Sequence, residues 1–174
     1  MTAFFRALLA PLIAPLLALA LAAPALAAPV QALHLTADLV AETTSAAPGS
    51  TVWVALVQKI DKGWHTYWRN PGDAGEATKI VWSLPPGWQA GDIVWATPKR
   101  LPVGPIMNYG YEGQVVLPVP IQVPASAAPG QTMTLKAAVA LLVCADVCVP
   151  ADANVSLNLP IASGTPAADP HGGP

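Results

Sequence analysis

Hydrophobic and polar residues alternate with a period of two along much of the chain. In Val30–Glu42 the odd-numbered positions from 33 to 39 are apolar and the even-numbered positions from 34 to 38 are polar. This pattern predicts a half-buried β-strand. Further strand-length segments are rich in β-branched, aromatic or apolar residues and are separated by turn residues. They are Thr51–Ile60, Trp64–Trp68, Thr78–Leu84, Asp92–Trp95, Gly113–Val123, Met133–Val143 and Asn154–Leu159.

The connections between these segments are rich in residues that break regular structure. The chain has 20 prolines and 13 glycines, and no segment after the first 27 residues has a clear helical period. Residues 96–108 form a long segment interrupted by proline, and Cys144–Ala153 is expected to be a turn. Pro118 and Pro120 remove two backbone donors from Gly113–Val123, which favours an edge or bulged strand. The pattern predicts an all-β, immunoglobulin-like β-sandwich of about seven to nine short strands.

The first 27 residues differ in character from the rest. Arg6 precedes an apolar run, and Ala25-Leu26-Ala27 has the small-x-small pattern of a signal-peptidase site. We expect residues 1–27 to be a signal peptide, residues 28–162 one immunoglobulin-like domain, and residues 163–174 a flexible tail or linker. An uncleaved N-terminal anchor is the alternative for the first segment. Composition adds an exclusion: the net charge is −2 and no basic patch is present, which argues against nucleic-acid binding.

Cys144 and Cys148 are the chain's two cysteines. Fully extended, four residue steps span about 13 Å, so a bond between them requires a tight turn. Closing so short a loop stabilises a fold by about 2 kcal/mol, against about 4.7 kcal/mol for a loop of 100 residues. A bridge between distant strands would stabilise more. The spacing therefore favours a redox-active pair, with a structural disulfide as the alternative.

Three motifs in order resemble the N-terminal periplasmic domain of the DsbD/ScsB family of thiol:disulfide interchange proteins. They are Trp64–Gly75 (WHTYWRNPGDAG), Tyr109–Gly113 (YGYEG) and Leu142–Pro150 (LVCADVCVP). The resemblance extends from about Leu33 to Leu159, and the cysteine spacing is that of the ScsB-like branch.

The resemblance implies a periplasmic protein-disulfide reductase domain with catalytic Cys144 and Cys148 and no cofactor or metal beyond the redox-active disulfide. Its electrons would come from a membrane-embedded DsbD/ScsB-type donor, in cis or in trans, and the thioredoxin-like domain of that donor. They would pass to periplasmic thioredoxin-like acceptors, for example in cytochrome c biogenesis. Cys148 would be the attacking thiol and Cys144 the resolving one.

The same resemblance suggests further residues around the pair. Met107, Asn108 and Tyr109 align with a cap loop, and Tyr109 is the candidate aromatic lid; an ordinary hairpin tyrosine is the alternative. Tyr67 is expected to line the site. Asp146 is expected either to carry protons or to stabilise the turn. With no basic residue obviously placed beside the cysteines, we expect a near-normal or raised thiol pKa and activation by partner docking.

Two other functions remain open. Soft thiolates suit Cu(I), so Cys144 and Cys148 could belong to a copper-binding module, with His65, Met107 or His171 recruited as further ligands. The chain could also be a non-enzymatic immunoglobulin-like binding module with an inert disulfide. A reduction potential below about −300 mV would indicate the inert bridge.

Overall fold

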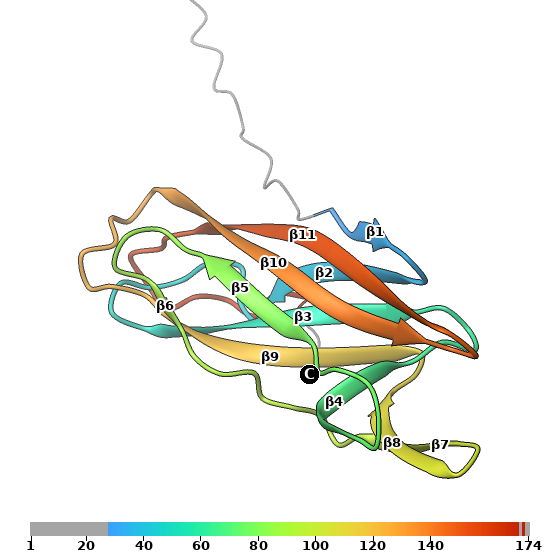
Figure 1. The fold of residues 1–174 in the computed structure, drawn as a ribbon. Coiled ribbons are helices and arrows are strands. Elements are labelled where there is room, and N and C mark those ends of the chain that lie inside the picture. The colour runs from blue at the N-terminus through green and yellow to red at the C-terminus, as the bar shows by residue number, and fades with distance from the viewer. Residues whose placement is uncertain (1–27, 171, 173–174) are drawn as a thin grey trace, which may run out of the picture.

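The structure is a computed structural model that describes residues 28–170 and 172. Within these residues the chain forms eleven strands and no helix (Figure 1). The strands are β1 (Val30–Ala32), β2 (Leu35–Ala41), β3 (Thr51–Ile60), β4 (Thr66–Gly72), β5 (Lys79–Ser83), β6 (Gln89–Ala90), β7 (Lys99–Val103), β8 (Ile106–Tyr111), β9 (Gln114–Gln122), β10 (Thr132–Cys144) and β11 (Cys148–Pro160).

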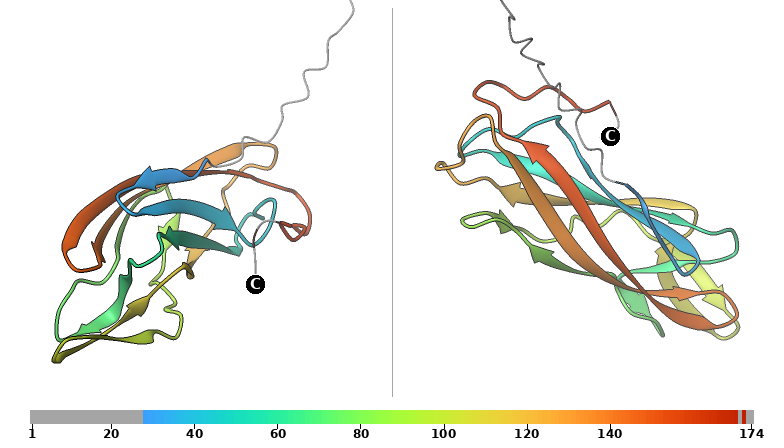
Figure 2. Two further views of the ribbon diagram at one scale, coloured as in Figure 1. Left: turned by 90° about the vertical axis from the view of Figure 1, so that its right-hand side faces the viewer. Right: turned by 90° about the horizontal axis from the view of Figure 1, so that it is seen from above.

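The strands form three antiparallel sheets. One has the order β1-β2-β3-β9-β6, the second β11-β10-β5 and the third β4-β8-β7. Apolar side chains from the first two sheets meet in one hydrophobic core. The third sheet lies at the end of the sandwich where the β10–β11 hairpin has its tip (Figures 1 and 2). The arrangement confirms the predicted all-β, immunoglobulin-like β-sandwich.

Alternation along the strands builds this core. In β3 the even-numbered residues from Val52 to Ile60 are buried. In β10 the odd-numbered residues from Leu135 to Val143 are buried, and their even-numbered neighbours up to position 140 are exposed. A period of two places successive side chains on opposite faces, so each strand contributes one apolar face.

The strand count exceeds the predicted seven to nine because one predicted strand is divided in two and because β6, β7 and β8 were not anticipated. Val30–Glu42 divides into β1 and β2 at a turn where His34 has a positive φ of 58°. The segment 96–108, expected to be irregular, contains β7 and the start of β8.

The prediction of a strand at Asp92–Trp95 is wrong, and the short strand β6 lies just before it. Residues 91–94 nevertheless follow β9: Gly91 N donates to Pro120 O and Val94 N to Pro118 O, both at 2.8 Å. The two prolines offer carbonyls but no N–H groups in return, so a full ladder cannot form there. The prediction of an edge or bulged strand for this segment is wrong, because β9 pairs with β3 on one side and β6 on the other, and its register with β3 is unbroken.

The long turn predicted at Cys144–Ala153 is also wrong, because the chain reverses within residues 145–147. β10 and β11 have 13 residues each, and every residue of β10 pairs with one of β11. Pro150 is tolerated since β11 is an edge strand, where a missing N–H can face away from the ladder.

Both ends of the chain bear on the predicted boundaries. The predicted signal peptide lies outside the described residues. In the predicted tail, Thr44 N donates to Ala167 O at 2.9 Å and Asp169 N to Glu42 O at 2.8 Å, so residues 167–169 run beside 42–44. Nowhere in residues 28–170 is there a helix that could cross a membrane.

Candidate functional site

The two cysteines form a disulfide across the tip of the β10–β11 hairpin. Cys144 ends β10, Cys148 begins β11, and the two residues pair directly with Cα atoms 4.1 Å apart. Ala145 N donates to Val147 O at 2.9 Å and closes the turn. Cys144 is 1% exposed, whereas Cys148 is exposed and its neighbour Val147 is 64% exposed. One end of the bridge is thus buried and the other faces the surface.

His65, the residue just before β4, holds the buried end of the bridge in place. His65 N donates to Cys144 O at 2.9 Å, and Cys144 N donates to His65 O at 3.0 Å. These two bonds form an isolated antiparallel bridge between His65 and Cys144. Residues two apart on a strand share a face, so Tyr67 follows on the same side as His65.

Three side chains meet at this junction. The Tyr67 hydroxyl lies 3.7 Å from Cys148 Sγ and 3.2 Å from His65 Nε2. The two rings make an edge contact with centroids 5.1 Å apart. Tyr67 is 2% exposed and His65 8% exposed. The hydroxyl therefore connects a buried imidazole to the exposed end of the disulfide.

Burial shifts the pKa values of His65 and Tyr67 in the directions that favour their neutral forms. Desolvation lowers the pKa of His65, with a smaller opposing effect from the Glu112 carboxylate. Desolvation also raises the pKa of Tyr67. A neutral imidazole has one ring nitrogen free to accept a proton. His65 is therefore a basic group that is connected to the bridge through the Tyr67 hydroxyl.

The loop that follows β4 packs against the Tyr67 ring. Gly75 has φ +100°, and a Cβ at this position would overlap that ring. Three bonds fix the loop to β8: Met107 N donates to Asp73 Oδ2 at 2.7 Å, Asp73 N donates to Met107 O at 3.1 Å, and Ala74 N donates to Asn108 Oδ1 at 3.1 Å. The loop of residues 73–75 thus has a fixed structure, and it also limits where Tyr67 can lie.

A buried polar network lies next to the site on the core side of β4. Thr66 Oγ1 donates to Gln58 Oε1 at 2.9 Å, and Gln58 Nε2 donates to Thr78 Oγ1 at 3.1 Å. Gln58 is 0% exposed. Thr66 stands between His65 and Tyr67, so the network fixes the backbone that carries both.

The structure brings some of the predicted site residues together and leaves others apart. Tyr67 contacts Cys148, and Asp146 lies exposed in the turn between the cysteines. Asn108 is buried and, with Met107, binds the 73–74 loop. Tyr109 is partly exposed and pairs with Arg100 in the β7–β8 hairpin, at the same end of the sandwich as the bridge (Figures 1 and 2). Its role as a lid stays a prediction.

Sequence reasoning missed two residues of this region. The sequence suggested His65 only as a possible copper ligand, although its spacing of two from Tyr67 places both on one face. Gln58 is polar at an inward position of an otherwise apolar face, between Leu56 and Ile60. Such a buried amide requires partners, and that requirement was the available signal.

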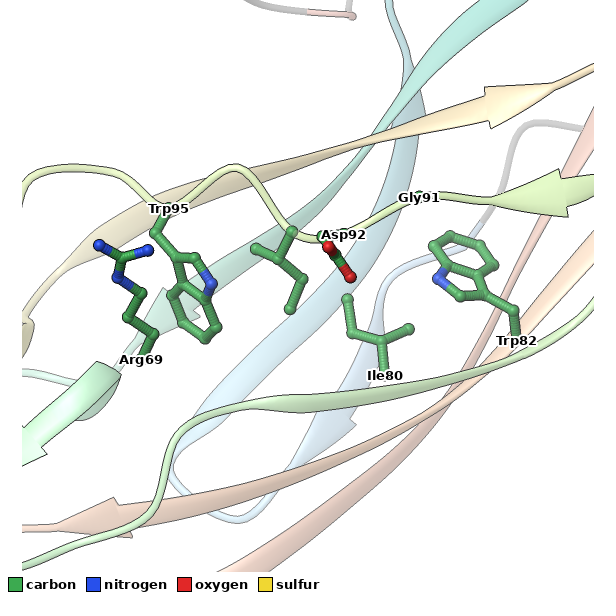
Figure 3. A pocket seen from close by; sticks show the side chains of 7 residues that line it. Arg69, Ile80, Trp82, Gly91, Asp92 and Trp95 are labelled. Carbon is green, nitrogen blue, oxygen red and sulfur yellow. The ribbon is translucent and has the colours of Figure 1, made fainter.

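A separate groove of about 400 Å³ lies between β5 and residues 91–95. Trp82 and Trp95 stand toward its two ends, with Ile80 and Asp92 between them and Arg69 beside Trp95 (Figure 3). None of the residues that line the groove belongs to the disulfide site. Across the part of the chain that the structure describes, no three His, Cys, Asp or Glu side chains gather as metal ligands would.

Residues 34–160 match the family described as thiol:disulfide interchange protein DsbD, N-terminal. The chain belongs to this family. The match confirms the predicted membership and contains all three motifs that suggested it. Among solved structures, the chain is similar to the N-terminal periplasmic domain of ScsB from Proteus mirabilis, with a TM-score of 0.52 and 28% sequence identity.

That similarity covers 72% of this chain and 44% of the ScsB chain, so this member of the DsbD N-terminal family spans less than half of that relative's length. No curated protein matches the chain significantly. Family and fold are therefore established, together with a disulfide at the hairpin tip.

Proposed function

We propose that this domain is a periplasmic thiol-disulfide interchange relay that uses the Cys144–Cys148 pair. It takes electrons from a membrane-embedded DsbD/ScsB-type donor through the donor's thioredoxin-like domain and passes them to periplasmic thioredoxin-like acceptors. The family match and the periplasmic ScsB relative support the activity and the compartment. The observation that carries the proposal is the bridge itself, which has one buried and one exposed end.

That asymmetry suits exchange chemistry. A thiolate attacks one sulfur of a disulfide and expels the other, so the attacked sulfur must be accessible. An incoming partner thiolate reaches Cys148, forms a mixed disulfide with it and releases Cys144 as a thiolate. In the reverse direction, the Cys148 thiolate attacks the partner's disulfide, and Cys144 then resolves the mixed disulfide.

The surrounding hairpin lets the bridge open without loss of the fold. Every residue of β10 pairs with β11, and the core faces of both strands are buried. The bridge closes a loop of five residues, which contributes about 2 kcal/mol in the chain-entropy picture. The ladder therefore holds the two thiols opposite each other after reduction and keeps them ready to close again.

Trapping of mixed disulfides tests the proposal. Cys144→Ser leaves the exposed Cys148 without a resolving thiol, so it should accumulate a stable mixed disulfide with an oxidised thioredoxin-like protein. Cys148→Ser leaves only the buried Cys144 and should trap little and reduce no partner. Equal trapping by both variants would contradict the roles assigned to the cysteines. No trapping by either, or partner reduction by Cys148→Ser, would contradict the relay.

A further inference from the structure

We propose that His65, acting through the Tyr67 hydroxyl, accepts the proton that Cys148 loses when its thiol becomes a thiolate. The inference concerns the reduced state. It rests on the proposed function only for the later step, in which the thiolate attacks a partner's disulfide. Its basis is the continuous chain of contacts from His65 Nε2 to Tyr67 Oη, 3.2 Å, and from Tyr67 Oη to Cys148 Sγ, 3.7 Å.

The Tyr67 hydroxyl is suited to connect the two groups. A phenolic hydroxyl has one proton to donate and lone pairs with which to accept, so it can accept from the thiol while it donates to the imidazole. The geometry is fixed from several sides. His65 is bonded through its backbone to Cys144, and the backbone of Gly75 lies against the Tyr67 ring. The first contact fixes the backbone of His65, and the second limits where the Tyr67 ring can lie.

The proton transfer balances as follows. The Cys148 S–H bond breaks and its proton passes to the Tyr67 oxygen, while the Tyr67 O–H bond breaks and that proton passes to His65 Nε2. The products are a thiolate, a neutral tyrosine and an imidazolium, and no group is oxidised or reduced in this step. The thiolate then attacks the partner's disulfide, where one S–S bond forms and another breaks, and the partner's sulfur leaves as a thiolate.

The charged groups around His65 are consistent with a neutral imidazole before the transfer. Burial lowers the pKa of His65, and Glu112, which follows β8, opposes this shift only in part. Lys99 Nζ binds Glu112 Oε2 at 3.2 Å and offsets its charge. From the β10–β11 hairpin the facing groups are the two cysteines, with Asp146 exposed in the turn.

The pH dependence of Cys148 alkylation tests this proton transfer. The reduced domain is treated with iodoacetamide between pH 5 and 10, and Cys148 modification is followed by peptide mass spectrometry. We expect the wild-type rate to persist below the ordinary thiol pKa of about 8.5, in contrast to the near-normal or raised thiol pKa that the sequence alone suggested. His65→Gln keeps a hydrogen-bonding side chain but cannot take the proton. It should slow alkylation at pH 7 about tenfold, which corresponds to a thiol pKa about one unit higher.

Two matched controls separate the effect of the proton transfer from a general loss of structure. His34→Gln changes a histidine that stacks on Trp64, and Tyr111→Phe removes a buried hydroxyl that donates to Ala96 O. Both should keep the wild-type profile, while Tyr67→Phe should match His65→Gln. A wild-type profile in His65→Gln, or the same shift in either control, would overturn the proposal.

A second measurement needs no variant. The His65 ring is titrated by NMR in the oxidised and the reduced wild-type domain. Reduction should raise the His65 pKa, because the thiolate stabilises the imidazolium. An unchanged His65 pKa would overturn the proposed proton transfer. Neither measurement uses a protein partner. The proposed proton transfer can therefore be refuted while mixed disulfides still form. The proposed function can be refuted while the Cys148 thiol still titrates as described.

Discussion

Replacing Gly75 with alanine tests how tightly the loop after β4 positions Tyr67. Gly75 has φ +100°, and an added Cβ would overlap the Tyr67 ring. Gly63 is the matched control, because it has φ +85° and no neighbouring atom within 4 Å of an added Cβ. Both substitutions incur the backbone penalty of a positive φ, but only the first forces a buried ring to move.

The two costs can be separated in magnitude. An alanine in this backbone region costs about 1–2 kcal/mol, reduced by up to about 1 kcal/mol because alanine also restricts the unfolded chain. Inserting a methyl group into a packed site adds about 1–3 kcal/mol. We therefore expect Gly63→Ala to lower the unfolding free energy by about 1 kcal/mol and Gly75→Ala by about 2–4 kcal/mol.

Equilibrium urea unfolding of the oxidised domain at pH 7 measures both costs, provided that the m-values agree. In a Tyr67→Ala background the extra cost of Gly75→Ala should disappear, since the ring is gone. The two residues would then show a coupling energy of about 1–3 kcal/mol. Equal costs for Gly75→Ala and Gly63→Ala, or no coupling to Tyr67, would refute the packing role assigned to the loop.

Three further predictions concern the surroundings of the site. Gln58→Leu should lower the unfolding free energy in urea by about 1–3 kcal/mol, because Thr66 and Thr78 lose their buried partner; an unchanged midpoint would contradict the network. Tyr109→Ala should speed reduction of the disulfide by glutathione if the ring shields it, and an unchanged rate would rule the lid out. Burial raises the pKa of Asp38 above 3.8, so the stability associated with its protonated form is fully present below about pH 3.8 and is lost as pH rises through the raised pKa. Asp38→Asn should therefore increase the unfolding free energy more at pH 7 than at pH 3, and a pH-independent difference would contradict this assignment.

The strand pattern was readable from the sequence where alternation is strong and uninterrupted. Thr51–Ile60 was predicted with the bounds that β3 has. The pattern failed where prolines or small residues weaken it. At Cys148–Ala153, Pro150 and short side chains hid the first half of β11. At residues 91–94, backbone donors bind β9 without forming a strand.

The cysteine pair was readable because its short spacing requires a turn and its motif resembles a known family. The proton-accepting neighbour was not, since the contact between Tyr67 and Cys148 joins residues 81 apart in sequence. It depends on the bridge between His65 and Cys144, which only the fold defines. Likewise, the contact of the 73–75 loop with Tyr67 depends on how β8 holds that loop.

The redox equilibrium of the oxidised domain with a reduced thioredoxin-like protein of known potential tests the central claim most directly. We expect the Cys144–Cys148 bridge to exchange, with a reduction potential in the range of about −270 to −120 mV that thioredoxin-like proteins span. A bridge that does not exchange, or one with a potential below about −300 mV, would mean that the disulfide is structural.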